Sequence, residues 1–317
     1  MNASVVLPIR NGMSHIDRCI AYLATNCDDS DEIVVICNGS TDNSAAKLRS
    51  ITQYDSRFRI IETGDIGLVR AMNLGVSESS NSWIFRVDVD DLYDTTRFQV
   101  QKEAILGNPR LVALFSDYQF MGGNDENLGI IPSAVHPSAV PISLVSGFRT
   151  PHPVAVFNKH AFFDAGGYME NDFPSEDLSL WLRISRLGFL ETIPSNLLKY
   201  RISSGSVTSK NRSISKTKAA DILNTIRLGR SSITNFNLDL SAILKDYEKY
   251  SHHEGRLILL AMDVLKLKKL GYISRSEFVE LTLQFSRRMR PHLAKTLFTL
   301  YQEKNLRDQY RKLQSIS

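Results

Sequence analysis

Short apolar runs typical of strands alternate with segments of helical spacing through the first 120 residues, and this alternation restricts the fold more than any other feature. We predict strands at residues 4–7, 32–37, 59–62, 83–87 and 111–120, the first of them closed by Pro8. Between them we predict helices at residues 11–24, about 41–51, 68–77 and 95–106, with Ser40 or Thr41 and Thr95 or Thr96 as caps. Strands that alternate with helices form βαβ units, so the sequence predicts an α/β fold with a mainly parallel sheet.

Polar residues gather where two of these strands end. The turn Asn38–Asp42 follows the second strand, and the carboxylates Asp88, Asp90 and Asp91 follow the fourth. Ligands of parallel α/β sheets bind beyond the carboxyl ends of the strands. We therefore expect both segments to line one crevice.

The three carboxylates of residues 88–91 predict a cation site. Carboxylates without partners are costly to bury, and oxygen ligands suit Mg²⁺ or Mn²⁺. In enzymes these ions commonly bridge protein carboxylates to a substrate diphosphate. The cluster therefore indicates an enzyme that acts on a nucleotide-activated molecule. On the cluster alone, a solvated turn that caps the next helix is an open alternative.

The distribution of charge separates the chain into two parts. Residues 1–209 contain 17 Lys and Arg against 24 Asp and Glu, whereas residues 210–317 contain 21 against 10. After a polar, basic stretch at residues 209–218 we predict helices at 219–229, 238–250, 255–270, 276–289 and 293–313. We therefore expect an α/β domain at residues 1–209, with halves at about 1–120 and 121–209, and a basic, all-helical C-terminal extension at 210–317.

Composition bears on location and partners. The chain has no run of 18 apolar residues and no basic leader, so we predict neither a transmembrane helix nor a signal peptide. Cys19, Cys27 and Cys37 lack metal-ligand spacing and are expected to be reduced thiols of a cytoplasmic protein. The basic extension either approaches anionic lipid headgroups, as on the inner face of a membrane, or is an ordinary helical surface. It lacks a zinc finger, an RNA-binding signature and a basic zipper, so no nucleic-acid partner is expected.

Several segments stand in the order that is typical of one enzyme family. They are Val5–Asn11, with a Pro-x-x-Asn turn; Glu32–Asp42, with Gly-Ser-Thr-Asp; Gly67–Gly75; Arg86–Asp91, followed by Arg97 and Gln101; Gly166–Tyr168; Glu176–Arg183; and Tyr200–Arg201. Over residues 1–209 the chain thus resembles the family 2 glycosyltransferases of the GT-A fold, bacterial enzymes that build lipopolysaccharide, capsule and related polysaccharides. The resemblance implies a GT-A (Rossmann-like) domain and a nucleotide-sugar donor.

The resemblance implies roles for residues at the strand ends. Asp90 is expected to be the chief metal ligand, and Asp88 to contact the metal through water or to hold the ribose. Arg86 is expected to meet the diphosphate, the alternative being a surface cation on a strand. Asn38 stands where the family often has an Asp that helps to hold the base, which leaves the base open. The other donor-binding residues that the resemblance implies are Pro8, Arg10, Asn11, Ser40, Asp42, Arg70 and Asn73.

Acceptor-side roles follow from the same resemblance. Asp177 matches the family's catalytic carboxylate, and repulsion between Glu176 and Asp177 can keep one of them ready to take a proton near neutral pH. The alternative for both is an ordinary charged first turn of a helix. His152 is expected to bond an acceptor hydroxyl or a phosphate, or to be an ordinary loop histidine. Trp181 is expected to stack on a sugar, or to be a core side chain at helical spacing.

Together these residues predict an inverting, metal-dependent glycosyltransferase. Its expected donor is a nucleotide sugar, with a UDP-sugar as first choice, and its expected acceptor is a glycan or a lipid-linked glycan. One alternative is a sugar nucleotidyltransferase, which usually needs a Gly-rich, basic loop after the first strand, whereas Pro8–Met13 contains one glycine. The other alternative is a catalytically silent, nucleotide-binding scaffold.

Overall fold

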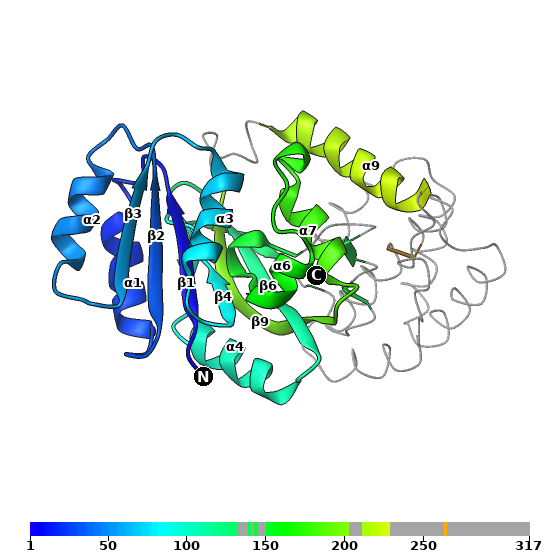
Figure 1. The fold of residues 1–317 in the computed structure, drawn as a ribbon, viewed down its shortest axis with the longest axis horizontal. Coiled ribbons are helices and arrows are strands. Elements are labelled where there is room, and N and C mark those ends of the chain that lie inside the picture. Colours follow the sequence, from blue (N-terminus) through cyan, green and yellow to red (C-terminus); the bar gives the residue numbers. More distant parts are fainter. Residues whose placement is uncertain are drawn as a thin grey trace.

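The computed structural model describes residues 1–131, 133, 139–140, 143–144, 150–202, 211–228 and 263–264. Figure 1 shows a central sheet with helices on both of its faces, and α9 (Arg212–Leu228) beside the second half of the sheet. Of the helices predicted after residue 229, residues 263–264 are described and helical, and the rest lie outside the described residues. No helix within the described residues is both long enough and apolar enough to cross a lipid bilayer.

The first half of the sheet is parallel. Its strands are β1 (Ser4–Ile9), β2 (Glu32–Asn38), β3 (Phe58–Thr63) and β4 (Trp83–Arg86), in the order β3-β2-β1-β4. The register sets Val6 of β1 opposite Val34 on one side and opposite Arg86 on the other. The carboxyl ends of these strands therefore lie at one edge of the sheet.

The second half of the sheet is mixed. β8 (Val156–Asn158) pairs antiparallel with β4 and with β6 (Leu111–Met121). β6 also pairs parallel with the long β9 (Phe189–Arg201) and antiparallel with β7 (Asn127–Ile131). β5 (Leu92–Tyr93) forms the edge against β9. Most paired residues belong to the parallel pairs, so the prediction of an α/β fold with a mainly parallel sheet is confirmed.

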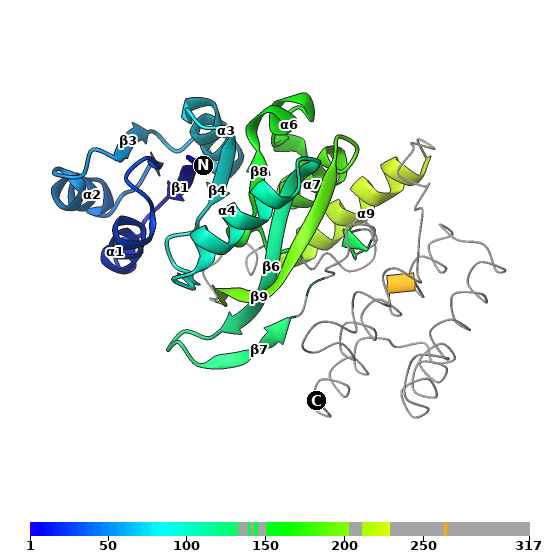
Figure 2. The same ribbon diagram turned by 90° about the horizontal axis from the view of Figure 1, so that it is seen from below.

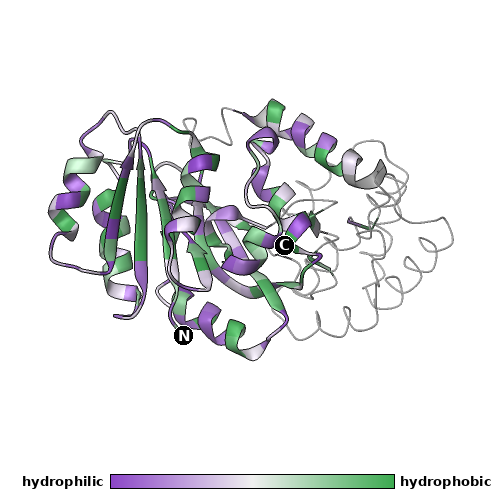
Figure 3. Cartoon of the chain, viewed as in Figure 1, coloured by the Kyte–Doolittle hydropathy of each residue, from purple (hydrophilic) through white to green (hydrophobic). Residues whose placement is uncertain are grey.

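Helices cover the two faces of the sheet, as the view in Figure 2 shows. α1 (Ile16–Asn26), α2 (Ser44–Thr52) and α4 (Arg97–Gly107) pack on one face, against residues such as Val5 and Leu7. The opposite face packs against α3 (Leu68–Glu78), α6 (Lys159–Asp164) and α7 (Glu176–Ile184), mainly through residues such as Val6. Because β1 is buried on both faces, every residue in it is apolar or small, and Figure 3 shows the central strands as hydrophobic.

Close packing of α3 on the sheet depends on a glycine. A Cβ atom at Gly75 would lie 2.4 Å from Cγ1 of Val6, so a larger residue there would push the helix away from β1. The helix is the one predicted at residues 68–77, and its bounds agree to within one residue. The three cysteines are buried and unpaired, as expected of reduced thiols.

The first strand extends past the proline that was expected to close it. Pro8 lies within β1, in register with Ile36 of β2. β4 pairs with β1 at residues 4–6, so Pro8 has no neighbour in β4 that would need its missing N–H group.

Two helices begin later than predicted. α1 starts at Ile16 rather than at residue 11, because Asn11 has a φ of +53° and its side chain binds the next loop. α2 starts at Ser44, so Ser40 and Thr41 are not its caps; Ser40 Oγ instead accepts the backbone N–H of Asn11 at 3.1 Å. Thr96 does occupy the position before α4, although its side chain makes no capping bond.

The later part of the domain departs more from the prediction. β9 covers 13 residues and α6 covers six, and neither was predicted. α9 begins at Arg212, so residues 212–218 of the expected polar linker are helical. The hydroxyl of Ser175, at the start of α7, donates to the carbonyl oxygen of Ser215 in α9 at 3.1 Å. That bond joins the domain to the first helix of the basic extension.

Candidate active site

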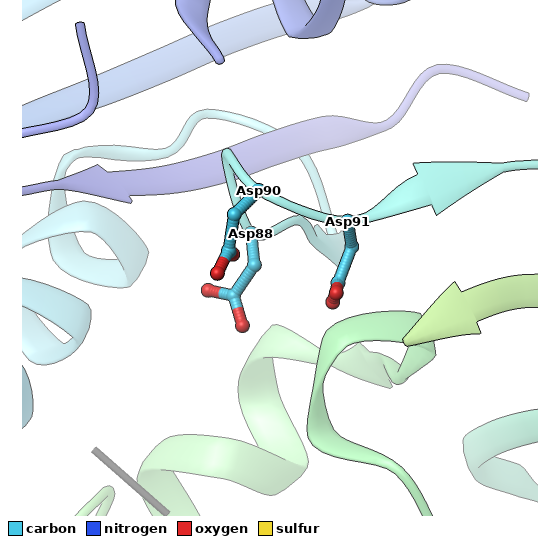
Figure 4. Close-up of side chains that lie close together, drawn as sticks. All are labelled: Asp88, Asp90 and Asp91. Carbon is cyan, nitrogen blue, oxygen red and sulfur yellow. The ribbon is translucent and has the colours of Figure 1, made fainter. Parts of the chain in front are cut away.

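Three carboxylates follow the end of β4. Figure 4 shows the side chains of Asp88, Asp90 and Asp91 on the same side of their turn. One oxygen of each lies within 4.8 Å of an oxygen of each of the others. β4 is parallel to β1 and β2, so this turn and the turn Asn38–Asp42 lie at the same edge of the sheet, as predicted.

The surroundings of these carboxylates favour a cation. Burial raises the pKa of Asp91 well above its ordinary value, and repulsion from Asp88 and Asp90 adds to the effect. Asp91 is 5% exposed, and its Oδ2 has no hydrogen-bond partner among the described residues. Converging oxygens, one of them buried and unpartnered, fit Mg²⁺ or Mn²⁺. The structure thus adds Asp91 to Asp88 and Asp90 as a residue able to hold such an ion.

Arg86 pairs with the acidic turn, and its charge also acts on the start of α7. Its side chain is 4% exposed and its Nη1 pairs with Oδ2 of Asp88, so the alternative of a surface cation is wrong. The charge of Arg86 also acts to lower the pKa of both Glu176 and Asp177, against the larger effect of their burial. The charge of Arg86 therefore acts both on the acidic turn and on the two acids at the start of α7.

Arg97 and Gln101 support the strand that carries Arg86. Arg97 Nη2 donates to the carbonyl oxygen of Arg86 at 2.7 Å, and Arg97 Nε donates to Oε1 of Gln101 at 3.0 Å. Gln101 Nε2 donates to the carbonyl oxygen of Val154 at 2.9 Å. Both α4 side chains are fully buried, so they hold β4 against the segment His152–Val154 and do not line the site.

Two adjacent acids begin α7. Glu176 is buried, and burial together with repulsion from Asp177 raises its pKa to about 8. Asp177 is partly exposed, and its Oδ1 accepts the backbone N–H of Leu178 at 2.8 Å. Burial raises the pKa of Asp177 to about 6. Near pH 7 Glu176 therefore keeps its proton while Asp177 is ionised, a division of roles that lets Asp177 accept a proton.

His152 and Trp181 are both buried. His152 Nε2 lies 2.7 Å from the hydroxyl of Tyr168, and burial lowers the pKa of His152 well below its ordinary value. The histidine is therefore a buried, neutral ring and not a loop residue in solvent. Trp181 is fully buried, and its ring packs 5.1 Å from that of Phe115. A ring with no exposed face cannot stack on a sugar, so the structure places Trp181 in the core.

Three of the residues predicted to hold the donor, Asn11, Ser40 and Asp42, lie in the loops after β1 and β2, and these loops bind one another. Asn11 Oδ1 accepts the backbone N–H groups of Thr41 and Asp42 at 2.7 and 3.3 Å. In return, Asp42 Oδ2 accepts the N–H of Met13 at 3.2 Å. Asn11, Ser40 and Asp42 thus shape the edge of the sheet, and their contact with a donor stays a prediction.

Asn38 and Arg10 lie beside the loop that precedes α3. Asn38 Oδ1 accepts the backbone N–H of Ile66 at 2.9 Å, so the NH₂ group of Asn38 takes no part in that bond and points away from Ile66. Arg10 pairs with Asp65 at 2.6 Å, and both side chains are about half exposed. Gly39 has a φ of +59°, and a Cβ there would meet the backbone of Asp65 at 2.5 Å. This loop therefore approaches the end of β2 closely.

Arg70 and Asn73, on α3, contact Glu170 and Tyr168 in the structure. Arg70 Nε pairs with Oε1 of Glu170 at 2.8 Å on the surface. Asn73 binds the backbone of Tyr168 twice, accepting its N–H at 3.0 Å and donating to its carbonyl oxygen at 2.9 Å. Asn73 thus positions Tyr168, and a donor contact for either residue stays a prediction.

Two further residues contact the acidic turn without having been predicted to do so, although Arg201 lies in one of the segments that resemble the family. The Tyr93 hydroxyl accepts the backbone N–H of Asp88 at 2.7 Å, and the backbone N–H of Arg201 donates to Oδ1 of Asp91 at 2.7 Å. Tyr93 is five residues from its partner, but Arg201 is 110 residues from Asp91. No periodic or local signal in the sequence marks Arg201 as a neighbour of the carboxylates.

Sequence comparison places the chain among glycosyltransferases. The family model described as "Glycosyl transferase family 2" matches residues 4–163. An uncharacterized glycosyltransferase of Haemophilus influenzae is 26% identical over 302 residues, which cover 89% of this chain and 91% of the relative. The O-antigen biosynthesis glycosyltransferase WbnJ of Escherichia coli is 28% identical over 190 residues, or 57% of this chain and 70% of that protein.

Two solved structures have a similar fold. S. aureus TarS 1-349 in complex with UDP-GlcNAc has a TM-score of 0.56 at 14% identity, covering 99% of this chain and 91% of that one. The mannosyltransferase PcManGT of Pyrobaculum calidifontis, in complex with GDP-Man and Mn²⁺, has a TM-score of 0.53 at 14% identity, covering 96% and 87%. The fold is that of the GT-A glycosyltransferases, as predicted. With a family model that matches half of its residues, the chain belongs to glycosyltransferase family 2 and is a glycosyltransferase.

Proposed function

We propose that this glycosyltransferase is an inverting, metal-dependent enzyme that uses a nucleotide sugar. The observation that carries the proposal is the place of Arg86, which pairs with Asp88 and whose charge also acts to lower the pKa of Glu176 and Asp177. Asp88, Asp90 and Asp91 converge at the end of β4, and Glu176 and Asp177 begin α7. The first group suits a cation with a diphosphate, and the second suits removal of a proton.

The proposed reaction exchanges one bond at the anomeric carbon. The oxygen of an acceptor hydroxyl bonds to that carbon while the bond from carbon to the phosphate oxygen breaks. Asp177 takes the proton of the hydroxyl at a carboxylate oxygen, and the electron pair of the broken bond leaves on the nucleoside diphosphate. A single attack opposite to the leaving group inverts the anomeric centre.

Residues of this chain would hold the leaving group in place. Asp90, with Asp88 and Asp91, would hold Mg²⁺ or Mn²⁺, which when bound supplies positive charge to the diphosphate. Arg86 keeps one buried N–H group, at Nε, without a partner among the described residues. That group can donate to a phosphate oxygen. Glu176, protonated near pH 7, adds no second negative charge beside Asp177.

Two comparisons support a nucleotide-sugar donor. TarS was solved with UDP-GlcNAc and PcManGT with GDP-Man and Mn²⁺. We propose a UDP-sugar as the donor of this chain, the class of donor with which TarS was solved. The amide of Asn38 can donate to a carbonyl of the base through the NH₂ group that faces away from Ile66.

The acceptor and the location are also proposals. WbnJ is named for O-antigen biosynthesis, which supports a glycan or lipid-linked glycan acceptor in the synthesis of a cell-surface polysaccharide. The basic composition of residues 210–317 supports contact with anionic lipid at the inner face of the cytoplasmic membrane. The transferase domain would then be residues 1–209.

A thermal-shift panel tests the proposal. UDP, GDP, dTDP and CDP are each added with and without Mn²⁺, and unfolding is followed by fluorescence. A nucleotide at a hundred times its dissociation constant stabilises a protein by about 2.7 kcal/mol. We expect UDP to raise the melting temperature by several degrees, and to do so with Mn²⁺ present. The absence of a shift with all four nucleotides, with or without Mn²⁺, would contradict the proposal.

A further inference from the structure

Arg201 is the last residue of β9, and its buried side chain joins three parts of the chain. The side chain is 6% exposed. Its Nε donates to the carbonyl oxygen of Asp90 at 2.8 Å, and its Nη1 donates to the carbonyl oxygens of Gly122 and Gly123 at 3.1 and 3.0 Å. Its Nη2 pairs with Oδ1 of Asp125 at 2.5 Å. All three nitrogens of the guanidinium therefore have oxygen partners.

The same residue fixes the carboxylate of Asp91 through its backbone. The N–H of Arg201 donates to Asp91 Oδ1 at 2.7 Å, which leaves Oδ2 as the buried, unpartnered oxygen of the acidic cluster. One residue thus holds the backbone at Asp90 and the side chain at Asp91. The rotation of the Asp91 carboxylate is set before any cation arrives.

The other partners of Arg201 belong to the turn between β6 and β7, which is itself anchored. Asp125 has a φ of +64°, and its Oδ2 accepts from Nη1 of Arg18, on α1, at 2.9 Å. The guanidinium charge of Arg201 is therefore balanced by Asp125, outside the acidic cluster. Arg86, by contrast, pairs directly with a carboxylate of the cluster, that of Asp88.

We infer that Arg201 is a positioning residue that holds the turn Asp88–Asp91 in its cation-binding form, an inference that rests on the proposed function. Three converging carboxylates repel one another, so without restraint the turn would open and would have to be reordered on binding. Arg201 restrains it by neutral backbone contacts and leaves the carboxylate charges for the cation. The planar guanidinium reaches four separate oxygens, which the point charge of a lysine cannot match.

Direct measurement of Mn²⁺ binding tests this role without any transfer reaction. Mn²⁺ is titrated into the protein without nucleotide, and the free ion is followed by electron paramagnetic resonance. We compare wild type with Arg201→Lys, and use Arg18→Gln as the matched control, because Arg18 binds the same Asp125 from the exposed side. Residues behind metal ligands typically contribute about 10–100-fold to affinity, so we expect Arg201→Lys to raise the Kd at least about tenfold. Arg18→Gln should leave it within about twofold.

The outcomes separate this inference from the proposed function. Mn²⁺ binding by wild type and equal binding by a folded Arg201→Lys variant would overturn the positioning role alone. Failure of wild type to bind Mn²⁺, with or without nucleotide, would overturn the metal dependence of the proposed function and the inference with it. If Arg201→Lys does not fold, Asp125→Asn replaces it, since it loosens the same guanidinium at a half-exposed position. An Mn²⁺ affinity of Asp125→Asn no weaker than that of Arg18→Gln would then overturn the inference.

Discussion

Replacement of Glu176 by Gln should change how the stability of the protein depends on pH. Glu176 is buried at the start of α7, and its pKa in the folded protein is raised from 4.5 to about 8 by burial and by repulsion from Asp177. Between these two pH values the folded protein keeps a proton that the unfolded chain releases. The stability that this group contributes is therefore fully present below pH 4.5 and is lost as the pH rises through about 8.

The size of the effect follows from the displacement of the pKa. A change from 4.5 to about 8 corresponds to a free-energy difference on the order of 4 kcal/mol between pH 4.5 and pH 9. Gln has nearly the shape of the protonated acid and does not titrate. We therefore expect Glu176→Gln to match wild type in stability near pH 4.5, to exceed it by a growing margin as the pH rises to about 8, and to keep a constant margin above that.

Urea unfolding from pH 4.5 to 9, followed by circular dichroism, measures this difference. Glu103→Gln, on the exposed surface of α4, is the matched control, and its free energy of unfolding should differ from that of wild type by the same amount at every pH. If the free energies of unfolding of wild type and Glu176→Gln differ by the same amount at every pH over the whole range, the reasoning is refuted. Glu176 would then not hold a proton near pH 7, and the division of roles between Glu176 and Asp177 would fail.

Three further predictions concern the same structure. Because Asp177 must be ionised to take a proton and its pKa is about 6, kcat/KM should rise as the pH passes through about 6, and a flat profile from pH 4.5 to 8 would contradict this. Asp90→Asn should abolish the Mn²⁺-dependent part of the UDP thermal shift while leaving the melting temperature of the free protein nearly unchanged. Lys102→Met should lower the free energy of unfolding by about 3–5 kcal/mol, because it leaves the fully buried carboxylate of Asp31 without its ion-pair partner. Lys47→Met, which breaks the pair with the exposed Asp17, should lower the free energy of unfolding by less than about 1 kcal/mol. Equal losses for Lys102→Met and Lys47→Met in urea unfolding would be contrary to expectation.

The parallel half of the sheet could be predicted because burial on both faces leaves a simple trace in the sequence. β1 and β2 are continuous apolar runs, and the polar turns that follow them lie where the sheet ends. β9 leaves no such trace. Buried and partly exposed residues are mixed along it, and its register against β6 shifts at several points. β5 and β8 are two and three residues long, too short to show a period.

The acidic residues proposed for the site could be singled out from the sequence because they are neighbours in it and stand within segments that resemble one family. Asp88, Asp90 and Asp91 form one short motif, and Glu176 and Asp177 form another. The contacts that hold these acidic residues in place join positions far apart in the sequence, such as Arg201 and Asp90, and such contacts leave no local pattern. Trp181 shows a related limit, because helical spacing allows both a core side chain and a sugar platform, and burial decides for the core.

The central claim is that Asp177 takes the proton of the acceptor while other residues bind the donor. It is tested most directly by comparing Asp177→Asn with wild type in two assays, binding of the donor and release of its nucleoside diphosphate. The donor is the nucleotide sugar whose base the thermal-shift panel selects, and water serves as the acceptor. A general base typically contributes about 10²–10⁴-fold to a rate. We predict that Asp177→Asn binds the donor within about threefold of wild type and releases the diphosphate at least about a hundredfold more slowly. Release at the wild-type rate would contradict the account.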